Sequence, residues 1–197
     1  MDQTKLQQQG SAGGREIATF GGGCFWCLQP VFEDLQGVEK VEVGYSGGTV
    51  ANPSYPQVCT GKTGHAEVIQ VTFLPGVITY SQILEVFFAV HDPTTKDRQG
   101  ADVGTQYRSV IFYRNESQRK AAEQVIRQIE SENTWGSPVV TQVVPFEAFY
   151  RAEEYHQNYF VHNPEQSYCR VTIAPKVAKF RNKYASRLKG VEEKSRQ

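Results

Sequence analysis

Three consecutive glycines, Gly21–Gly23, separate an apolar, β-prone segment from an amphipathic one. The residues before them, Ile17–Phe20, are typical of a strand, and the apolar residues after them recur at helical spacing. Glycine permits the tight turn that joins a strand directly to a helix. Cys24 then stands at the predicted helix start, where unpaired amides and the helix dipole favour a thiolate. The sequence therefore predicts a strand–turn–helix unit that presents a nucleophilic cysteine of lowered pKa.

The composition indicates a folded globular domain. The chain has 197 residues, of which 39% are hydrophobic and 21% charged, so it can bury a core of ordinary size. Its formal net charge is zero, which gives no electrostatic reason to expect a nucleic acid or a membrane surface as partner. No apolar run approaches the ~20 residues that span a bilayer. Because Met1–Arg15 lacks the apolar stretch of a secretory signal, we expect a cytoplasmic protein.

Strand and helix patterns are mixed along the chain, which indicates an α+β domain. The predicted strands are Val38–Tyr45, Ala66–Phe73, Arg108–Tyr113 and Val139–Val144. The predicted helices are Tyr80–Val90, Glu116–Glu130 with Asn115 as its N-cap, and a last helix that begins at Pro175 and ends by Gly190. We expect a single domain over residues 16–190, a two-layer sandwich of a mixed β-sheet and packed helices. Residues 1–15 are expected to be a mobile tail and residues 191–197 a second tail.

Long irregular stretches lie between these elements, and long ordered loops usually serve function. They hold most of the His, Tyr and Asp residues that a core does not explain, so we expect them to surround Cys24. These stretches are Ser46–His65, His91–Tyr107 and Pro145–Arg170.

Cys24 and Cys27 form a C-x-x-C pair one helical turn apart, which in a cytoplasmic protein indicates redox chemistry. In this interpretation the first cysteine attacks and the second can close a disulfide. Two other interpretations are weaker. The pair could be buried and inert, or it could bind zinc, but a zinc site normally needs a second close pair, and Cys59 and Cys169 each stand alone.

Further polar side chains are candidates for acid–base chemistry. Period two places Glu67 on the same strand face as Ile69, where burial would raise the pKa of its carboxyl and make it a general acid. The pattern alone nevertheless favours an exposed glutamate at a strand end. Tyr55 and Tyr107 could donate hydrogen bonds to a developing oxyanion, although packing is the usual role of a tyrosine. Asp102 lies among glycines and is more typical of a turn.

The segment Glu153–Tyr159 is dense in polar and aromatic groups. A metal site of Glu153, His156 and His162 is one interpretation, but the spacing is not diagnostic. A hydrogen-bonded segment that caps the site is the favoured one. The basic residues of the last helix are interpreted as its solvated face.

Eight ordered motifs of this chain together resemble those of one family. They are Gly22–Trp26, Gly44–Gly48, Asn52–Tyr55, Thr63–Glu67, His91–Thr94, Gly104–Ser109, Tyr155–Gln157 and Asn163–Pro164. In this order they look like the motifs of peptide-methionine (S)-S-oxide reductase, the MsrA class. The resemblance runs from about Ile17 to Cys169.

The resemblance implies an enzyme of methionine sulfoxide repair, with a ferredoxin-like core inside the sandwich and no bound cofactor or metal. It implies that Cys24 is the nucleophile, Glu67 the proton donor, and Tyr55 and Tyr107 the hydroxyls that hold the sulfoxide oxygen. The resemblance also implies which residues bind the substrate. By the same resemblance Phe25 and Trp26 form the wall for the S-methyl group, and Asp102 meets the substrate backbone.

The expected reaction reduces the S epimer, protein-bound or free, through a cysteine sulfenic acid and then a disulfide. Thioredoxin or another dithiol then restores the enzyme, which we expect to be a monomer. The resolving cysteine is open between Cys169, which fits the position aligned with the family, and Cys27, which fits a C-x-x-C closure; the sequence slightly favours Cys169. Cys59 is expected to be a small buried residue. A general thiol–disulfide oxidoreductase and a zinc module are the alternative functions.

Overall fold

The computed structural model describes residues 14–190. The predicted tail at 191–197 and the first thirteen residues of the predicted tail at 1–15 lie outside the described residues. Arg15, the last residue of that predicted N-terminal tail, donates from Nη2 to a carboxylate oxygen of Glu39 at 3.2 Å. Within residues 14–190, no helix combines the length and apolar character needed to cross a membrane.

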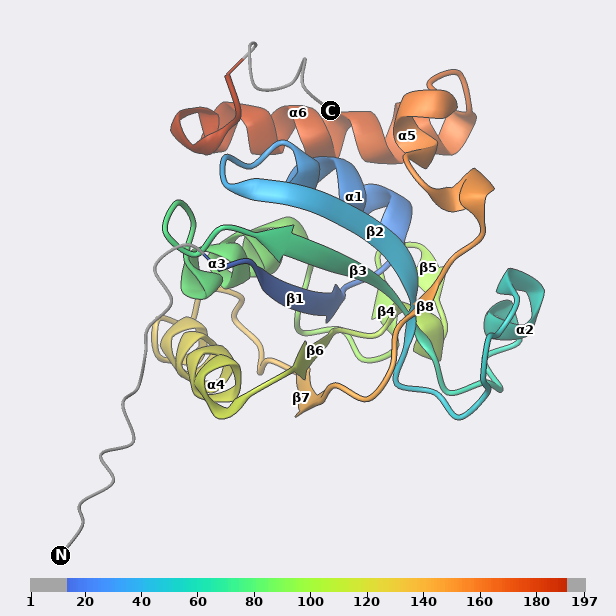
Figure 1. The fold of residues 1–197 in the computed structure, drawn as a ribbon, viewed down its shortest axis with the longest axis horizontal. Helices are drawn as coiled ribbons and strands as arrows, with labels where there is room; N and C mark the ends of the chain where they lie inside the picture. The colour runs from blue at the N-terminus through green and yellow to red at the C-terminus, as the bar shows by residue number, and fades with distance from the viewer. Residues whose placement is uncertain (1–13, 191–197) are drawn as a thin grey trace, which may run out of the picture.

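A mixed sheet of six strands forms the centre of the molecule, in the order β7-β6-β1-β3-β2-β8 (Figure 1). Its strands are β1 Glu16–Gly21, β2 Val38–Ser46, β3 Ala66–Phe73, β6 Val110–Tyr113, β7 Gln142–Pro145 and β8 Tyr150–Arg151. A separate hairpin consists of β4 Arg98–Gln99 and β5 Asp102–Val103. The longer helices are α1 Phe25–Glu33, α3 Tyr80–Val90, α4 Glu116–Ser131 and α6 Ala174–Lys183. Shorter turns are α2 Tyr55–Cys59, η1 Thr105–Tyr107, η2 Glu154–His156, α5 Tyr159–His162, η3 Cys169–Ile173 and η4 Ala185–Arg187.

The four central strands β6-β1-β3-β2 form the predicted ferredoxin-like core. β1 and β2 each pair antiparallel with β3, which lies between them, and β6 pairs antiparallel with β1. α1 connects β1 to β2, and α3 lies between β3 and β6 in the chain, so the order is βαββαβ. The parallel pair of β6 and β7 makes the sheet mixed. The predicted α+β sandwich is confirmed, and its topology places the start of α1 beside the start of β3.

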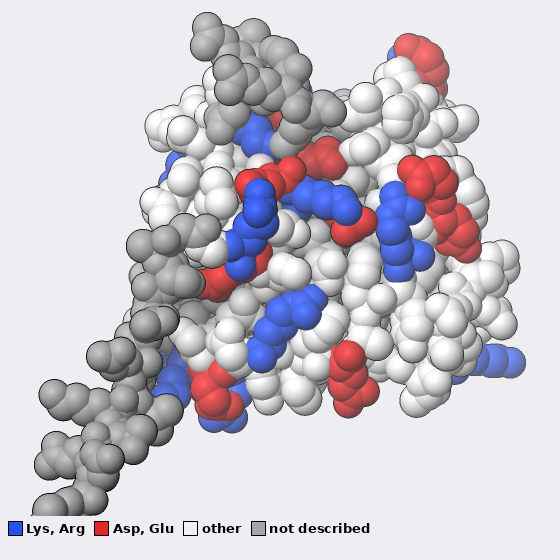
Figure 2. All heavy atoms as spheres, in the orientation of Figure 1, with Lys and Arg blue, Asp and Glu red and all other residues white. Residues whose placement is uncertain are grey.

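Apolar side chains fill the space between the sheet and its helices. Phe20 of β1, Ile69 of β3, Leu28 of α1 and Phe87 of α3 are completely buried there. A smaller apolar cluster on the opposite face is covered by the segment after β7. On the face of the molecule that Figure 2 shows, basic and acidic side chains are interspersed without a region of one sign, as the zero net charge suggests.

Most predicted elements are found, and the main difference, at the last helix, has a long-range cause. The predicted strand Ala66–Phe73 and helix Tyr80–Val90 have the observed bounds. Asn115 caps α4, because its side-chain oxygen accepts from the Gln118 amide at 2.9 Å. The last helix ends at Lys183 rather than near Gly190. The backbone beyond it bonds instead to the segment after α1: Arg187 accepts from the Gln36 amide and Lys189 donates to Asp34, both at 2.9 Å.

Candidate functional site

The glycine turn after β1 carries the first turn of α1 across the start of β3. A Cβ on Gly21 would lie 2.8 Å from the carbonyl oxygen of Glu67, so only glycine permits this close approach. Gly23 has φ +92°, a conformation that L side chains rarely adopt. The turn brings the Phe25 amide to 3.1 Å from Oε2 of Glu67, to which it donates. The predicted nucleophile and the predicted acid are thus held by adjacent elements.

The Glu67 side chain is only 1% exposed, so the interpretation as a solvated strand-end glutamate is wrong. It lies on the helix-bearing face, where the Cys24–Phe25 turn covers it. Burial is the main cause that raises the pKa of its carboxyl, from 4.5 to about 8, and the Phe25 hydrogen bond only partly opposes this. Glu67 therefore carries a proton at neutral pH and can act as an acid.

Cys24 is the N-cap of α1 and is 8% exposed. Burial, a hydrogen bond with Cys27 and the neighbouring Glu67 all raise the pKa of its thiol well above the ordinary value, and only the Trp26 amide acts in the opposite direction. The predicted lowering of the Cys24 pKa is therefore wrong. The glycine turn directs the sulfur into the protein, where desolvation outweighs the helix dipole.

Cys27 lies one turn further along α1. Its thiol interacts with Cys24 and, through the Tyr168 hydroxyl, with Asp102. Its hydrogen bond with Cys24 is the largest cause that lowers the pKa of its thiol to about 7, with smaller contributions from Lys176 and Tyr168. Its sulfur lies 3.6 Å from the Tyr168 hydroxyl, which donates to Oδ2 of Asp102 at 2.8 Å. The protonation of the two thiols of the C-x-x-C motif is therefore linked.

The other two cysteines differ from each other in exposure. Cys169 has no exposed surface and begins the π-helical turn that leads into α6. Burial raises the pKa of its thiol. Cys59 is exposed at the end of α2, so the expectation of a small buried residue at that position is wrong.

An aromatic wall stands beside Cys24. The Trp26 indole stacks on the Tyr159 ring, with centroids 3.8 Å apart and an angle of 9° between the planes. Its Nε1 donates to Nδ1 of His156 at 3.1 Å, so the His156 proton is on Nε2, which lies 3.7 Å from Oε2 of Glu153. Phe25 is completely buried beneath this wall. These contacts fix the orientation of the indole.

Two phenols complete the surroundings of Glu67. Burial raises the pKa of both Tyr55 and Tyr107, and the nearby Glu67 carboxyl adds to the effect, so both hydroxyls remain donors at neutral pH. The Tyr55 ring lies 4.4 Å from that of His156, and its amide donates to Oε1 of Glu153 at 2.7 Å. A thiol, a protonated carboxyl and two phenols therefore occupy one apolar site.

Comparison with known proteins shows the family of the chain. Residues 16–188 match the family model of peptide methionine sulfoxide reductase. The chain belongs to this family. A peptide methionine sulfoxide reductase MsrA of Deinococcus radiodurans is 52% identical over 187 residues, which cover 95% of this chain and 91% of the relative. The protein is thus a peptide methionine sulfoxide reductase of the MsrA class.

Solved structures agree with this assignment. The reduced form of Mxr1 from Saccharomyces cerevisiae superposes with a TM-score of 0.74 at 36% identity, over 79% of this chain and 89% of that one. Mxr1 has also been solved in complex with Trx2; that chain gives a TM-score of 0.54 at 26% identity, over 79% of this chain and 91% of the other.

The sequence pointed to Glu153 and His156 without giving their roles. They were weighed as metal ligands, and the motif Tyr155–Gln157 and the dense aromatic composition marked their segment. Glu153, His156 and Tyr159 lie in the segment predicted to cap the site, but their contacts with Trp26 and Tyr55 join distant parts of the chain.

Among residues 14–190 no cluster of three or more His, Cys, Asp or Glu side chains is arranged to hold a metal ion. Each of the three long stretches brings a tyrosine to the site: Tyr107 and Tyr168 lie near Cys24, and Tyr55 lies near Glu67.

Proposed function

We propose that this reductase acts on the S epimer of methionine sulfoxide, free or protein-bound, with Cys24 as nucleophile and Glu67 as acid. The observation that carries the proposal is the buried, protonated Glu67 next to the Cys24 thiol. Sulfoxide oxygen leaves sulfur only when it is protonated, so a neutral carboxylic acid is the group that the chemistry requires. Tyr55 and Tyr107 add two donors for the same oxygen.

In the proposed first step the substrate oxygen lies between the two phenols and Glu67. Glu67 delivers its proton to the oxygen while the Cys24 sulfur attacks the sulfoxide sulfur, and the thiol proton of Cys24 passes to the Glu67 carboxylate. The bond between the two sulfurs then breaks as the protonated oxygen moves from the substrate sulfur to the Cys24 sulfur. Methionine leaves with the electron pair as the reduced thioether, and Cys24 becomes a sulfenic acid. Glu67 ends the step protonated, as it began.

The raised pKa of Cys24 is compatible with this step. Part of the rise comes from the carboxylate charge of Glu67, which disappears when Glu67 carries its proton. An apolar site also disfavours a thiolate at Cys24 while no substrate is bound. Negative charge on the Cys24 sulfur therefore develops only during the attack, when the protonated sulfoxide oxygen accepts electrons. The aromatic wall of Phe25 and Trp26 favours the S-methyl group, and the fixed donors then select one configuration at sulfur.

In the proposed second step Cys27 attacks the Cys24 sulfenic acid, which forms a Cys24–Cys27 disulfide and releases water. Three observations favour Cys27 over Cys169, which the sequence slightly preferred. Cys27 lies one helical turn from Cys24 in α1, and in the reduced pair the interaction with the Cys24 thiol lowers the pKa of Cys27 to about 7, which favours its thiolate. Cys169 is completely buried, and burial raises the pKa of its thiol.

An external dithiol would then reduce this disulfide by exchange. Thioredoxin is the proposed reductant, because the related Mxr1 forms a complex with Trx2. No cofactor takes part in the proposed cycle.

The substrate assignment is tested with the purified S and R epimers of N-acetylmethionine sulfoxide and dithiothreitol. We expect turnover of the S epimer alone, and failure to reduce it would overturn the proposal. The resolving step is tested separately with Cys27→Ser and Cys169→Ser. Cys27→Ser should release about one methionine per enzyme and then stop with thioredoxin, whereas Cys169→Ser should continue to turn over. The opposite result would assign resolution to Cys169.

A further inference from the structure

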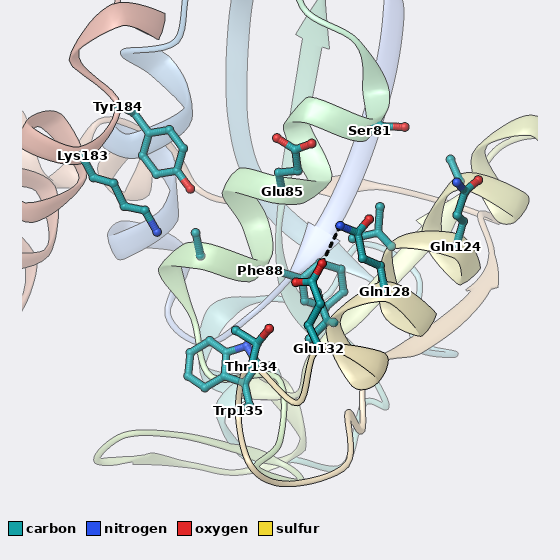
Figure 3. A pocket seen from close by; sticks show the side chains of 14 residues that line it. Ser81, Glu85, Phe88, Gln124, Gln128, Glu132, Thr134, Trp135, Lys183 and Tyr184 are labelled. Atoms are coloured by element: carbon teal, nitrogen blue, oxygen red, sulfur yellow. Dashed lines mark hydrogen bonds between the residues drawn. The ribbon is translucent and has the colours of Figure 1, made fainter.

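A hollow that the reaction does not use surrounds Trp135, in the loop after α4. One part of it, about 530 Å³, lies between α3, α4 and the end of α6, and it contains apolar carbon from Phe88, Val125 and Tyr184 (Figure 3). A second part of about 440 Å³ shares Trp135 and Tyr184 with the first and continues along α6. The Trp135 side chain remains 37% exposed, which leaves an indole available to a partner.

The α6 side of this hollow is strongly basic. Lys176, Lys179 and Lys183 all line its second part, and Asp92 is the one acidic residue there. One oxygen of the Asp92 carboxylate, Oδ1, accepts from the amide and the hydroxyl of Thr94, at 2.9 and 2.6 Å, so three lysines stand against one carboxylate in this part. No lysine of this strip forms an ion pair with a carboxylate in the part of the chain that the structure describes. The sequence interpretation of these lysines as a solvated face agrees with the exposure of Lys179 and Lys183, but Lys176 is half-buried.

The basic strip begins next to the catalytic turn. Gln99 lines the same part of the hollow as Lys176, and its Cβ and Cγ lie within 2.7 Å of the position that a Cβ on Gly23 would occupy. Gln99 pairs with Asp102 across the β4–β5 hairpin, so one hairpin borders both the hollow and the catalytic site. The charge of Lys176 also acts on the Cys27 thiol. A chain that leaves the catalytic site across this hairpin would meet the lysines directly.

We propose that the second part of this hollow, along α6, binds an acidic, extended segment of a protein substrate while the methionine sulfoxide of the same substrate occupies the site at Cys24. The first part is lined by Glu85 and Glu132 and does not favour an acidic side chain. The proposal rests on the proposed function.

None of the three ammonium groups has a carboxylate partner among residues 14–190, and that of Lys183 lies 5.4 Å from the centre of the Tyr184 ring. The three lysines can therefore pair with carboxylates of a ligand, and the indole of Trp135 at the far end suits an apolar side chain.

The spacing of the lysines fits an extended occupant. At about 1.5 Å of rise per residue, the seven steps from Lys176 to Lys183 span roughly 10 Å along α6. An extended chain covers that length in about three residues, so two or three neighbouring carboxylates would lie opposite the three ammonium groups. A hollow enclosed by α3, α4 and α6 admits such a segment more readily than the convex surface of a folded reductant.

The test compares peptides that carry one methionine sulfoxide and, on either side of it, a run of glutamates or the matching glutamines. Turnover is driven by dithiothreitol, so that thioredoxin plays no part. We expect the glutamate run to lower KM on only one side of the methionine sulfoxide. There KM should be about tenfold below that of the matching glutamine peptide, with kcat unchanged, because a few exposed ion pairs contribute about that much. High salt should remove the difference, because the Debye length falls to about 3 Å at 1 M.

The variant for this test is Lys179→Gln/Lys183→Gln, which leaves the catalytic residues intact. It should lose the preference for the glutamate peptide. The matched control, Lys120→Gln/Arg127→Gln, removes the same charge from exposed positions of α4 that do not line the hollow and should keep the preference. Equal KM values for both peptides, or an equal loss in the control, would each overturn the proposal. N-acetylmethionine sulfoxide should react equally with all variants; if it does not react at all, the proposed function fails instead.

Discussion

Replacement of Glu67 by glutamine should make the protein more stable and the enzyme much slower. The raised pKa means that folded protein holds the Glu67 proton more tightly than the unfolded chain does. The stability that this proton contributes is fully present below pH 4.5 and is lost as the pH rises to about 8. At about 1.4 kcal/mol per pH unit, a rise from 4.5 to about 8 corresponds to a loss of about 5 kcal/mol at most.

Glutamine keeps the shape of the side chain and an oxygen to accept from the Phe25 amide, but it does not ionise. The difference in unfolding free energy between Glu67→Gln and the parent protein should therefore grow by about 3 kcal/mol from pH 5 to pH 8. Urea unfolding of the reduced proteins at several pH values measures this difference. Glu165→Gln, a change at an exposed position, is the matched control and should not alter the pH profile.

The same substitution should slow sulfoxide reduction by a factor on the order of a hundred or more, because the proton donor is lost. In the parent enzyme the rate should fall as the pH rises through about 8, where Glu67 ionises. A stability difference that does not change with pH, together with a near-normal rate, would refute the reasoning. Glu67 would then be neither protonated nor an acid in the reaction.

Three further substitutions test the cap of α4, the glycine turn before α1 and the orientation of the Trp26 indole. Asn115→Ala should lower the unfolding free energy by about 1 kcal/mol, and Asn115→Asp should retain it, as thermal denaturation can measure. Gly23→Ala places a Cβ 2.6 Å from a neighbouring side-chain carbon at φ +92°, so turnover and melting temperature should both fall, whereas Gly76→Ala, with open space around it, should change neither. Trp26→Phe loses the N–H that bonds to His156 and should raise the KM for methionine sulfoxide about tenfold; an unchanged KM would show that the indole orientation is unimportant.

Local patterns in the sequence predicted most of the fold. The alternation in Ala66–Phe73 and the apolar spacing in Tyr80–Val90 arise from packing on one face, so they could be recognised without knowledge of the partners. The last helix was predicted too long, because its end is determined by hydrogen bonds with the residues after α1, more than a hundred positions earlier in the chain.

The site was predicted less completely, for a related reason. The position of Cys24 follows from the glycine turn, which is local. The direction of the Cys24 pKa change depends on how deeply distant segments of the chain bury the thiol. The helix dipole acts only locally and does not reflect this burial. The bond between Trp26 and His156 joins residues 130 positions apart, so no local pattern could predict it.

That long-range bond has a consequence for the order in which activity arises during protein synthesis. Cys24 leaves the ribosome early, and the ferredoxin-like strands are complete once β6 has emerged. His156 and Tyr159, which hold the Trp26 indole, are translated more than forty residues after β6 ends. The nascent chain can therefore fold its core while the wall for the substrate methyl group is still missing. The enzyme begins to recognise damaged methionine only when nearly all of its own chain has been made.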